Sequence, residues 1–342
     1  MKVQTVSISS SDVPAIELRN LGKNFEDFRA IDDVNLNVAQ GEVFGLLGPN
    51  GAGKTTTMRI IACLLSPTDG DVLVKGKSVR DPRNRTEISR EIGLLTESPN
   101  IYERLTAEQN LLFFARAYGV PENEIEGRIK KVLEEFNLAD RRNDRTVTLS
   151  KGMKQKLAIA RALVHGPSIL LLDEPTASLD AESAKMIRTQ ISETAKMGGH
   201  TVFLSTHNLD DASRLCDRIA FISRGRILAS GSEKEVARQV KRDQLDAKAD
   251  RVSISLINSE GFSEENLSRL IAGSKSIHKN GDGRTFELIF KDEYSDEEID
   301  SLTSKAIESL VAAGAKITSV VQSRPSLEDL YLEIVARERK QN

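Results

Sequence analysis

The chain has 342 residues, of which 48 are basic and 51 acidic, giving a formal net charge of −3. This length fits two or three domains, and the near-neutral charge excludes a protein that coats nucleic acid through bulk positive charge. The sequence shows no apolar run of roughly 18 residues and no secretory signal at its start, and its two cysteines form no CxxC pair, so composition predicts a soluble intracellular protein without disulfides or structural zinc.

The first 240 residues alternate between strand-like and helix-like segments. Short, continuous apolar runs, typical of strands buried on both faces of a sheet, occur at 42–47, 168–173, 201–205 and 218–223. Helical segments are expected at 53–65, 108–118, 125–136 and 179–195. This alternation predicts an α/β domain with a largely parallel sheet covered by helices.

The pattern changes after a charged stretch at 233–251, which is either a helix or a linker. We expect the domain boundary near Asp246, dividing the chain into residues 1–245 and 246–342. A turn at 279–284 predicts a hairpin in the second part. The expected strands are 251–258, 276–278, 285–291 and 316–322, and the expected helices are 263–272 and 296–313. Their β-α-β-β-α-β order is the ferredoxin-like arrangement, and a last helix is expected at 326–338.

Residues 48–55 fit the pattern G-x-x-x-x-G-K-[ST] between an apolar strand and a helix, which is the context that this phosphate-binding motif requires. Its glycines allow positive φ angles, and its amides can converge on phosphate oxygens beside a helix N-terminus. Lys54 is expected to contact the β- and γ-phosphates, and the Thr55 hydroxyl to ligate Mg²⁺. The alternative is a Gly-rich turn that contains Lys-Thr by chance, which the flanking strand and helix disfavour. The residues expected to bind the nucleotide here are Gly48, Pro49, Asn50, Gly51, Ala52, Gly53, Lys54, Thr55 and Thr56.

A second strand, 169–173, ends in two carboxylates, and the carboxyl ends of strands are where ligands bind in parallel sheets. Asp173 is the expected partner of Mg²⁺, directly or through water. Glu174 is the candidate base that polarises the attacking water. The alternative is a strand that ends in a solvated acidic turn, and the phosphate loop about 120 residues upstream disfavours it.

Together these motifs resemble those of an ATP-binding cassette (ABC) ATPase. Residues 149–156 resemble the ABC signature LSGGQ, 177–180 resemble the D-loop, and His207 matches the switch histidine. Phe25, placed before the first strands, has the position of the aromatic that stacks on adenine. The alternative is that Phe25 serves ordinary packing and Phe28 takes this role, although Phe28 is the one expected in the core. The motifs follow the family's order over about residues 15–235. The C-terminal segment 325–333 resembles the end of ATP-binding subunits of ABC-2 exporters.

The resemblance implies two cassettes with ATP buried between them, expected as a homodimer. Ser150 and Gly152 of one cassette are expected to complete the nucleotide site of the other. Asp180, in the segment that resembles the D-loop, is also expected to bind the nucleotide. Glu174 and His207 are expected to act in hydrolysis. Lys151 and Met153 depart from the usual signature, in which Gly152 is retained.

Glu97 stands where the family's Q-loop usually has glutamine. A carboxylate still suits Mg²⁺. We therefore expect Glu97 to join Thr55 and Asp173 as a metal ligand and to change how hydrolysis is coupled to movement of the partner.

The resemblance further implies an antiparallel N-terminal part of the sheet, a helical subdomain at about 98–165 and a smaller C-terminal α+β domain. It implies an ATP- and Mg²⁺-dependent ATPase subunit at the cytoplasmic face of the membrane. This subunit drives a separate transmembrane permease, and export is the expected direction of transport. Tyr102 and Arg104 are candidates for the permease contact, whereas 111–114 are expected in the core. The C-terminal domain is expected to stabilise the ATP-bound dimer, with a regulatory role as the alternative.

The alternative function is a soluble ABC ATPase that acts on DNA or ribosomes. The chain has a single phosphate loop, no sustained heptads and no cysteine cluster, which disfavours that class. Residues 245–342 hold 13 basic and 18 acidic side chains, a net charge of −5, which leaves +2 for residues 1–244. Neither part is a basic nucleic-acid binder, so no nucleic-acid partner is expected.

Overall fold

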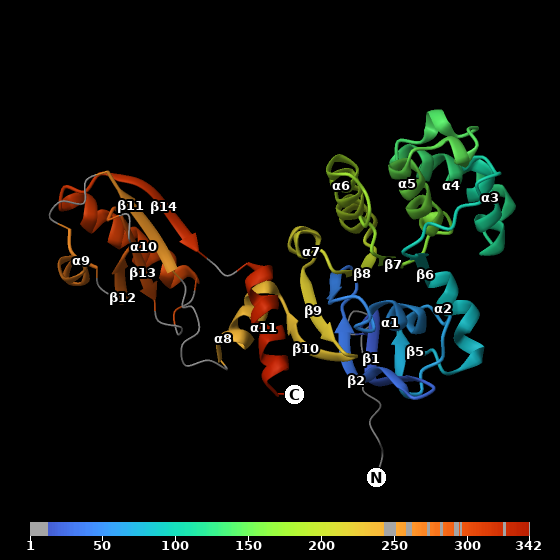
Figure 1. The fold of residues 1–342 in the computed structure, drawn as a ribbon. Coiled ribbons are helices and arrows are strands. Elements are labelled where there is room, and N and C mark those ends of the chain that lie inside the picture. The colour runs from blue at the N-terminus through green and yellow to red at the C-terminus, as the bar shows by residue number, and fades with distance from the viewer. Residues whose placement is uncertain are drawn as a thin grey trace, which may run out of the picture. The chain divides into compact units, whose positions relative to one another are not determined.

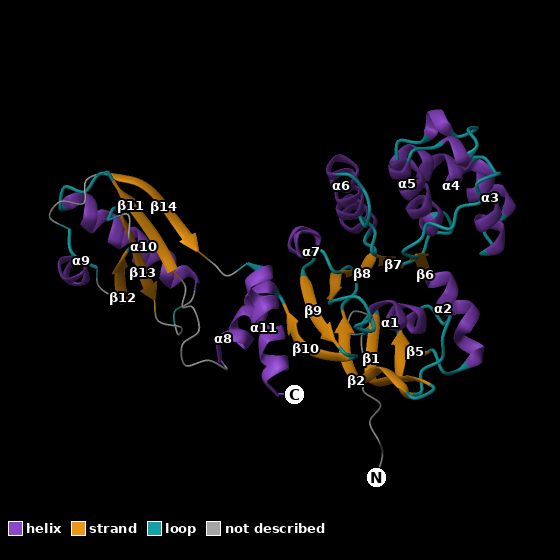
Figure 2. Cartoon of the chain, in the orientation of Figure 1, coloured by secondary structure: helices purple, strands orange, loops and turns teal. Residues whose placement is uncertain are grey.

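The structure is a computed structural model. It describes residues 13–242, 251–257, 262–271, 274–280, 283–290, 294, 296–323 and 326–341. The chain divides into two units, Met1–Glu233 and Lys234–Asn342, and each is described by itself (Figures 1 and 2). The boundary expected near Asp246 lies outside the described residues. Because the second unit begins at Lys234, helix α8 (Glu233–Arg242) belongs to it except for its first residue.

An antiparallel sheet forms the N-terminal part of the first unit. Strands β1 (Ile16–Phe25) and β2 (Phe28–Val38) form a hairpin in which Phe25 lies opposite Phe28. Strands β4 (Asp69–Val74) and β5 (Lys77–Ser78) complete the order β2-β1-β4-β5. Phe25 therefore ends the first strand, whereas the sequence analysis placed it before the strands. The mixed, largely polar sequence of β1 gave no strand signal there.

The larger sheet has six strands in the order β10-β9-β3-β8-β7-β6. Neighbouring strands in this sheet are parallel, except that β10 pairs antiparallel with β9. The four strands expected from apolar runs are all present, so the predicted α/β fold is confirmed. The bounds are β3 (Val43–Leu47), β6 (Ile92–Leu95), β7 (Ile169–Asp173), β8 (Thr201–Thr206), β9 (Arg218–Ser223) and β10 (Arg226–Gly231).

Strand β7 shows why such runs are apolar throughout. Side chains alternate between the two faces of a strand, and both faces of this sheet are covered. Ile169 and Leu171 lie in one core of the unit, whereas Leu170 and Leu172 lie in the other. The polar residue that ends the strand is thereby carried to the edge of a fixed, buried sheet.

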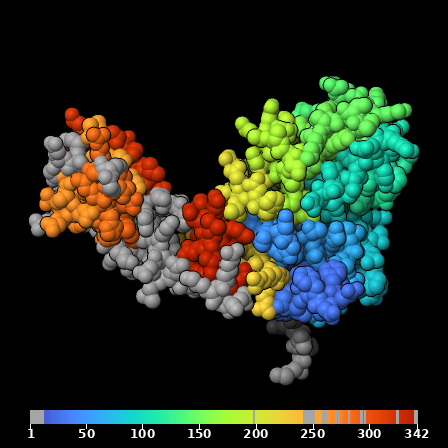
Figure 3. Space-filling model, viewed as in Figure 1, coloured from blue at the N-terminus to red at the C-terminus, as the bar shows by residue number. Residues whose placement is uncertain are grey.

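Helices cover both faces of the parallel sheet. Helix α1 (Lys54–Ile61) packs against β2 and β4 of one sheet and β7 and β8 of the other. Helices α3 (Ala107–Ala117), α4 (Glu122–Glu135) and α5 (Lys151–Leu163) pack against one another and form a continuous surface, coloured teal to green in Figure 3. The remaining helices are α2 (Arg85–Glu91), α6 (Ala181–Gly198) and α7 (Leu209–Leu215), with short 3₁₀ turns at 82–84, 139–141 and 146–148.

The second unit contains an antiparallel sheet in the order β12-β13-β11-β14. Its chain order is β11, α9, β12, β13, α10, β14, so the expected ferredoxin-like arrangement is present. Leu267 of α9 and Leu310 of α10 share one core with Ile254 and Phe286 of the strands. The bounds are α8 (Glu233–Arg242), β11 (Arg251–Leu256), α9 (Glu264–Leu270), β12 (Ser274–Lys279), β13 (Thr285–Phe290), α10 (Asp296–Ala312), β14 (Ile317–Ser323) and α11 (Leu327–Gln341).

Among the described residues, no helix combines the length and the apolar character needed to cross a membrane.

Candidate active site

The loop between β3 and α1 is shaped by glycines. Gly51 and Gly53 have φ angles of 80° and 108°, a region that favours glycine. A Cβ atom on Gly53 would lie 2.8 Å from the carbonyl oxygen of Ala30 in β2, so only glycine lets the loop approach that strand. Since α1 begins at Lys54, the N–H groups of its first turn have no partner within the helix. These groups and the positive end of the helix dipole suit an anion such as phosphate.

Lys54 provides the positive charge of this loop. Its buried Nζ donates to the carbonyl oxygens of Gly48, at 2.6 Å, and Pro49, at 3.3 Å. It also lies 3.5 Å from Oε1 of Glu174. The ammonium group is therefore held between the phosphate-binding loop and the carboxyl edge of the parallel sheet.

Asp173 ends β7 and faces the first turn of α1. Its Oδ2 accepts a hydrogen bond from the Thr55 hydroxyl at 2.9 Å, and its Oδ1 accepts one from the Ser205 hydroxyl. A hydroxyl and a carboxylate beside a phosphate site are the hard oxygen ligands that Mg²⁺ takes together with substrate phosphates. The described part of the chain has no group of three or more His, Cys, Asp or Glu placed to hold a metal by themselves. The two side chains thus fit a metal bound jointly with a phosphorylated ligand.

Glu174 and His207 follow neighbouring strands, β7 and β8, and meet at the same edge of the sheet. Oε1 of Glu174 lies 2.9 Å from Nδ1 of His207, and Oε2 accepts a hydrogen bond from the Thr206 hydroxyl at 3.3 Å. Glu174 is buried, whereas the side chain of His207 is 57% exposed. Glu174 has a φ angle of 50°, and its N–H donates to the Ser205 carbonyl at 2.9 Å. The fold therefore brings together the two residues that the sequence selected for catalysis.

Two phenylalanines at the tip of the β1–β2 hairpin line the other side of this site. Phe25 is 44% exposed and Phe28 is 63% exposed. The expectation that Phe28 belongs to the core is wrong, because the two-residue turn pairs it with Phe25 at the end of the hairpin. Both rings thus offer a flat apolar surface to a planar ligand.

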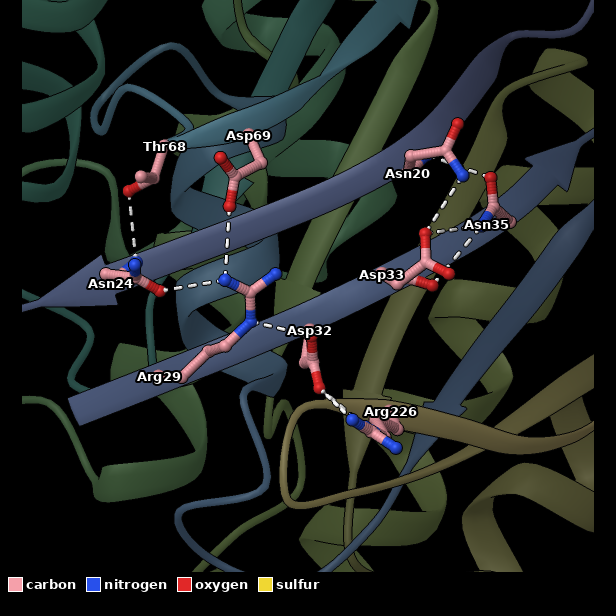
Figure 4. A network of polar contacts seen from close by, with 9 residues as sticks. All are labelled: Asn20, Asn24, Arg29, Asp32, Asp33, Asn35, Thr68, Asp69 and Arg226. Atoms are coloured by element: carbon pink, nitrogen blue, oxygen red, sulfur yellow. Dashed lines mark hydrogen bonds and ion pairs between the residues drawn. The ribbon is translucent and has the colours of Figure 1, made fainter.

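A polar network holds this hairpin in place (Figure 4). Nε of Arg29 donates to Asp32 at 2.6 Å, and its Nη1 lies 3.2 Å from Asp69 of β4. Asp32 also accepts from Nε of Arg226 in β10 at 2.6 Å. The hydrogen bond from Arg226, and to a smaller extent the one from Arg29, lowers the pKa of Asp32 below its ordinary value. The network ties the strands on either side of the aromatic tip to β4 and β10.

The backbone completes this connection. The N–H of Asp32 donates to the carbonyl of Gly225 at 2.9 Å, and the N–H of Gly225 donates to the carbonyl of Ala52 at 3.0 Å. The hairpin, the β9–β10 turn and the phosphate-binding loop are thereby fixed to one another.

These elements enclose a cleft of about 350 Å³. The cleft brings together Phe25, Glu97, Glu174 and His207 with the predicted residues of the phosphate loop other than Gly48. Asp173 is not among the residues that line it. Three further lining residues, Phe28, Ala30 and Ala177, were not among the predicted site residues. Ala30 has no local sequence signal, because strand pairing brings it to the cleft. The lining consists of Phe25, Phe28, Ala30, Pro49, Asn50, Gly51, Ala52, Gly53, Lys54, Thr55, Thr56, Glu97, Glu174, Ala177 and His207.

Ser150, Gly152 and Asp180 are not among the residues that line this cleft. Ser150 caps the N-terminus of α5 by accepting from the Met153 N–H at 3.3 Å, and Asp180 caps α6 by accepting from the Ser183 N–H at 2.9 Å. The Ser183 N–H and hydroxyl together lower the pKa of Asp180. A Cβ on Gly152 would lie 2.8 Å from Oγ of Ser183, so this glycine lets α5 pack closely beside the Ser183 side chain.

Comparison with known proteins agrees with this geometry. Residues 31–177 match the sequence model of the ABC transporter family. The ABC transporter ATP-binding protein NatA of Bacillus subtilis is 38% identical over 236 residues, covering 67% of this chain and 94% of NatA. The chain belongs to the ABC transporter family. Over a longer span, the linearmycin resistance ATP-binding protein LnrL of Bacillus subtilis is 30% identical over 325 residues, covering 94% of this chain and 98% of LnrL.

Solved structures place the first unit among ATP-binding cassettes. The ATP-binding subunit of an ABC transporter matches with a TM-score of 0.60 and 34% identity, covering 66% of this chain and 93% of that one. A dimeric cassette in a post-hydrolysis state with ADP and phosphate matches with a TM-score of 0.57 and 31% identity, covering 64% and 98%. The chain is therefore a nucleotide-binding subunit with an ATPase cassette, and the predicted family, fold and enzyme class are confirmed.

Proposed function

We propose that the chain is the ATP-hydrolysing subunit of an ABC exporter and works as a homodimer with a separate transmembrane permease at the cytoplasmic face of the membrane. The observation that carries the proposal is the single cleft that joins the phosphate-binding loop, the Glu174–His207 pair and the aromatic hairpin tip. Export is supported by relatives described as linearmycin resistance, bacitracin transport and Nod factor export ATP-binding proteins.

In this proposal the adenine ring stacks on Phe25, and the phosphates bind the loop amides and Lys54. Thr55, Asp173 and Glu97 would hold Mg²⁺, which when bound would supply charge neutralisation on the phosphate oxygens. Glu97 is exposed and lines the same cleft as the phosphate-binding loop.

Glu174 accepts the proton of the attacking water in this scheme. His207 holds the carboxylate through its Nδ1 contact and keeps it oriented toward the phosphate-binding loop. The 3.5 Å separation between Glu174 and Lys54 keeps the base next to the group that binds the γ-phosphate.

The homodimer gives Ser150, Gly152 and Asp180 a role outside their own cleft. Each lies at or beside the N-terminus of α5 or α6, where the helix dipole favours an anion. We propose that they face the triphosphate bound by the second copy. The dimeric cassette with ADP and phosphate supports this arrangement by its likeness to the first unit.

The permease contact is proposed to involve an aromatic patch made of Tyr102 and Phe113. They are 46% and 49% exposed, and their ring centroids are 5.2 Å apart. The expectation that 111–114 belong to the core holds for Leu111, which is fully buried, but not for Phe113. Arg104 is also exposed in the same loop, which follows Glu97 in the chain.

The test is co-expression with the permease of the same transport system, followed by isolation of membranes. The wild-type chain is expected in the membrane fraction with the permease, and the double variant Tyr102→Ser with Phe113→Ser is expected to lose the permease but keep ATP binding. Leu64→Ser, which changes another exposed apolar residue, is the matched control and should keep both. Recovery with ribosomes or DNA, and none with membranes, would support the soluble class instead.

The second unit has a core of its own, and we propose that it stabilises the ATP-bound dimer. Removal of residues 247–342 is then expected to weaken dimerisation with ATP, measured by sedimentation, while nucleotide binding to the monomer remains. Loss of nucleotide binding in this variant would contradict the division of roles.

A further inference from the structure

Next to the Glu174–His207 pair lies a buried carboxylate that the proposed chemistry does not use. Asp211, in the first turn of α7, is fully buried. Its Oδ1 accepts a hydrogen bond from Nη1 of Arg188 in α6 at 2.6 Å. Its Oδ2 accepts one from the hydroxyl of Thr176, which is also buried and lies two residues after Glu174. Asp211 thus joins the helix that follows the catalytic histidine to the loop that follows the catalytic glutamate.

These contacts belong to a ring that consists of hydrogen bonds and short stretches of backbone. The Thr206 hydroxyl donates to Glu174 at 3.3 Å and accepts from the N–H of Asn208 at 2.9 Å. Oδ1 of Asn208 accepts from the N–H of Asp211 at 3.3 Å, and Asp211 bonds to Thr176. The chain then returns from Thr176 to Glu174. The catalytic histidine lies between Thr206 and Asn208, so both of its neighbours in the chain are fixed by this ring.

Burial makes part of this ring rigid, at Thr176, Thr206 and Asp211, whereas Asn208 is exposed. Thr206 and Asp211 are inaccessible to solvent, so water cannot replace a lost partner there. A buried carboxylate is costly unless it is paired, and Arg188 supplies the opposite charge. A shift of α7 relative to the loop at Thr176 would therefore leave a buried carboxylate or hydroxyl without its partner. Asp211 does not line the cleft, so any effect on hydrolysis must pass through its neighbours.

We propose that Asp211 is a positioning residue that keeps His207 against Glu174. By joining α7 to the segment after β7, it holds Nδ1 of His207 at 2.9 Å from the Glu174 carboxylate. This proposal rests on the function proposed above, because it requires these two residues to act in ATP hydrolysis.

The first test compares Asp211→Asn with Asp210→Asn in the full-length chain. Asparagine keeps the shape of the side chain but removes the charge that binds Arg188. Asp211→Asn is expected to lower kcat about tenfold while changing the dissociation constant of ATP less than twofold, because the phosphate loop is untouched. Asp210 is the matched control, since it is exposed, pairs with Arg214 at 2.7 Å and lies 3.9 Å from Arg188, against 2.6 Å for Asp211. Its variant should match the wild type. An equal loss of kcat and of ATP affinity would indicate a merely structural role and would overturn the proposal.

The second test is a double-mutant cycle with His207→Ala. If Asp211 acts through His207, the variant that carries both changes should hydrolyse ATP no more slowly than His207→Ala alone. Rate losses that multiply would overturn the proposal. Should Asp211→Asn fail to fold by circular dichroism, Thr176→Val, which removes only the hydroxyl donor, takes its place with the same expected split and cycle.

The cycle also separates this proposal from the proposed function. Impaired turnover in His207→Ala with unchanged turnover in Asp211→Asn overturns only the positioning role. Wild-type turnover in both His207→Ala and Glu174→Gln overturns the catalytic pair, and the positioning role with it.

Discussion

Replacing Gly53 by alanine tests how closely the phosphate-binding loop approaches β2. Two costs add in this variant. A left-handed backbone costs about 1–2 kcal/mol for a residue with a Cβ. The new Cβ would also lie 2.8 Å from the Ala30 carbonyl oxygen, and overpacking of this kind costs about 1–3 kcal/mol because the strand must shift. The expected loss in the free energy of unfolding is therefore about 3 kcal/mol, or a fall in Tm of roughly 6–12 °C for a domain of this size.

Gly51→Ala isolates the contact from the backbone term. Gly51 is in the same loop with a φ angle of 80°, but a Cβ there would meet nothing within 4 Å. Its variant should lose only about 1–2 kcal/mol. Urea unfolding and ATP titration of the two variants measure both effects, and Gly53→Ala should also lose ATP affinity by displacing the loop amides. Equal stability of the two variants would refute the close approach of the loop to β2.

Three further outcomes are expected. Burial lowers the pKa of His165 to about 4, with Nε2 bonded to the Ile92 carbonyl. The unfolded chain therefore takes up a proton below about pH 6.5 that the native chain resists, so urea unfolding should show stability falling by ~1–2 kcal/mol from pH 7 to pH 5, and His165→Gln should flatten this slope. Phe25→Ala should weaken ATP binding about tenfold in titrations but leave inhibition by inorganic triphosphate unchanged, whereas loss of both would argue against base stacking. Glu97→Gln should alter the Mg²⁺ dependence of hydrolysis or its stimulation by the permease, and an unchanged response in both assays would remove Glu97 from metal binding.

Local sequence was sufficient where the chemistry itself is local. The phosphate-binding loop depends on consecutive residues between a strand and a helix, so its glycines, Lys54 and Thr55 could be selected directly. Strand β7 was equally clear, because burial on both faces requires an uninterrupted apolar run. The β-α-β-β-α-β order of the second unit followed from alternation and a hairpin turn.

Features that arise from tertiary pairing could not be predicted in the same way. The position of Phe28 depends on a two-residue turn between polar strands whose pairing is interrupted by register shifts. Ala30 reaches the cleft through the pairing of β2 with β1, and no local sequence pattern marks it. Asp211 is one of two adjacent aspartates in a polar helix, and only the fold buries one and exposes the other.

The central claim is that Glu174 activates water for hydrolysis of ATP bound in the cleft. The most direct measurement is a single-turnover assay of Glu174→Gln with ATP and Mg²⁺. ATP and ADP are then separated and quantified, and the monomer and dimer are separated by size. The account predicts that ATP binds with near-normal affinity, stays uncleaved and holds the chain as a dimer. Release of ADP at the wild-type rate by this variant would contradict it.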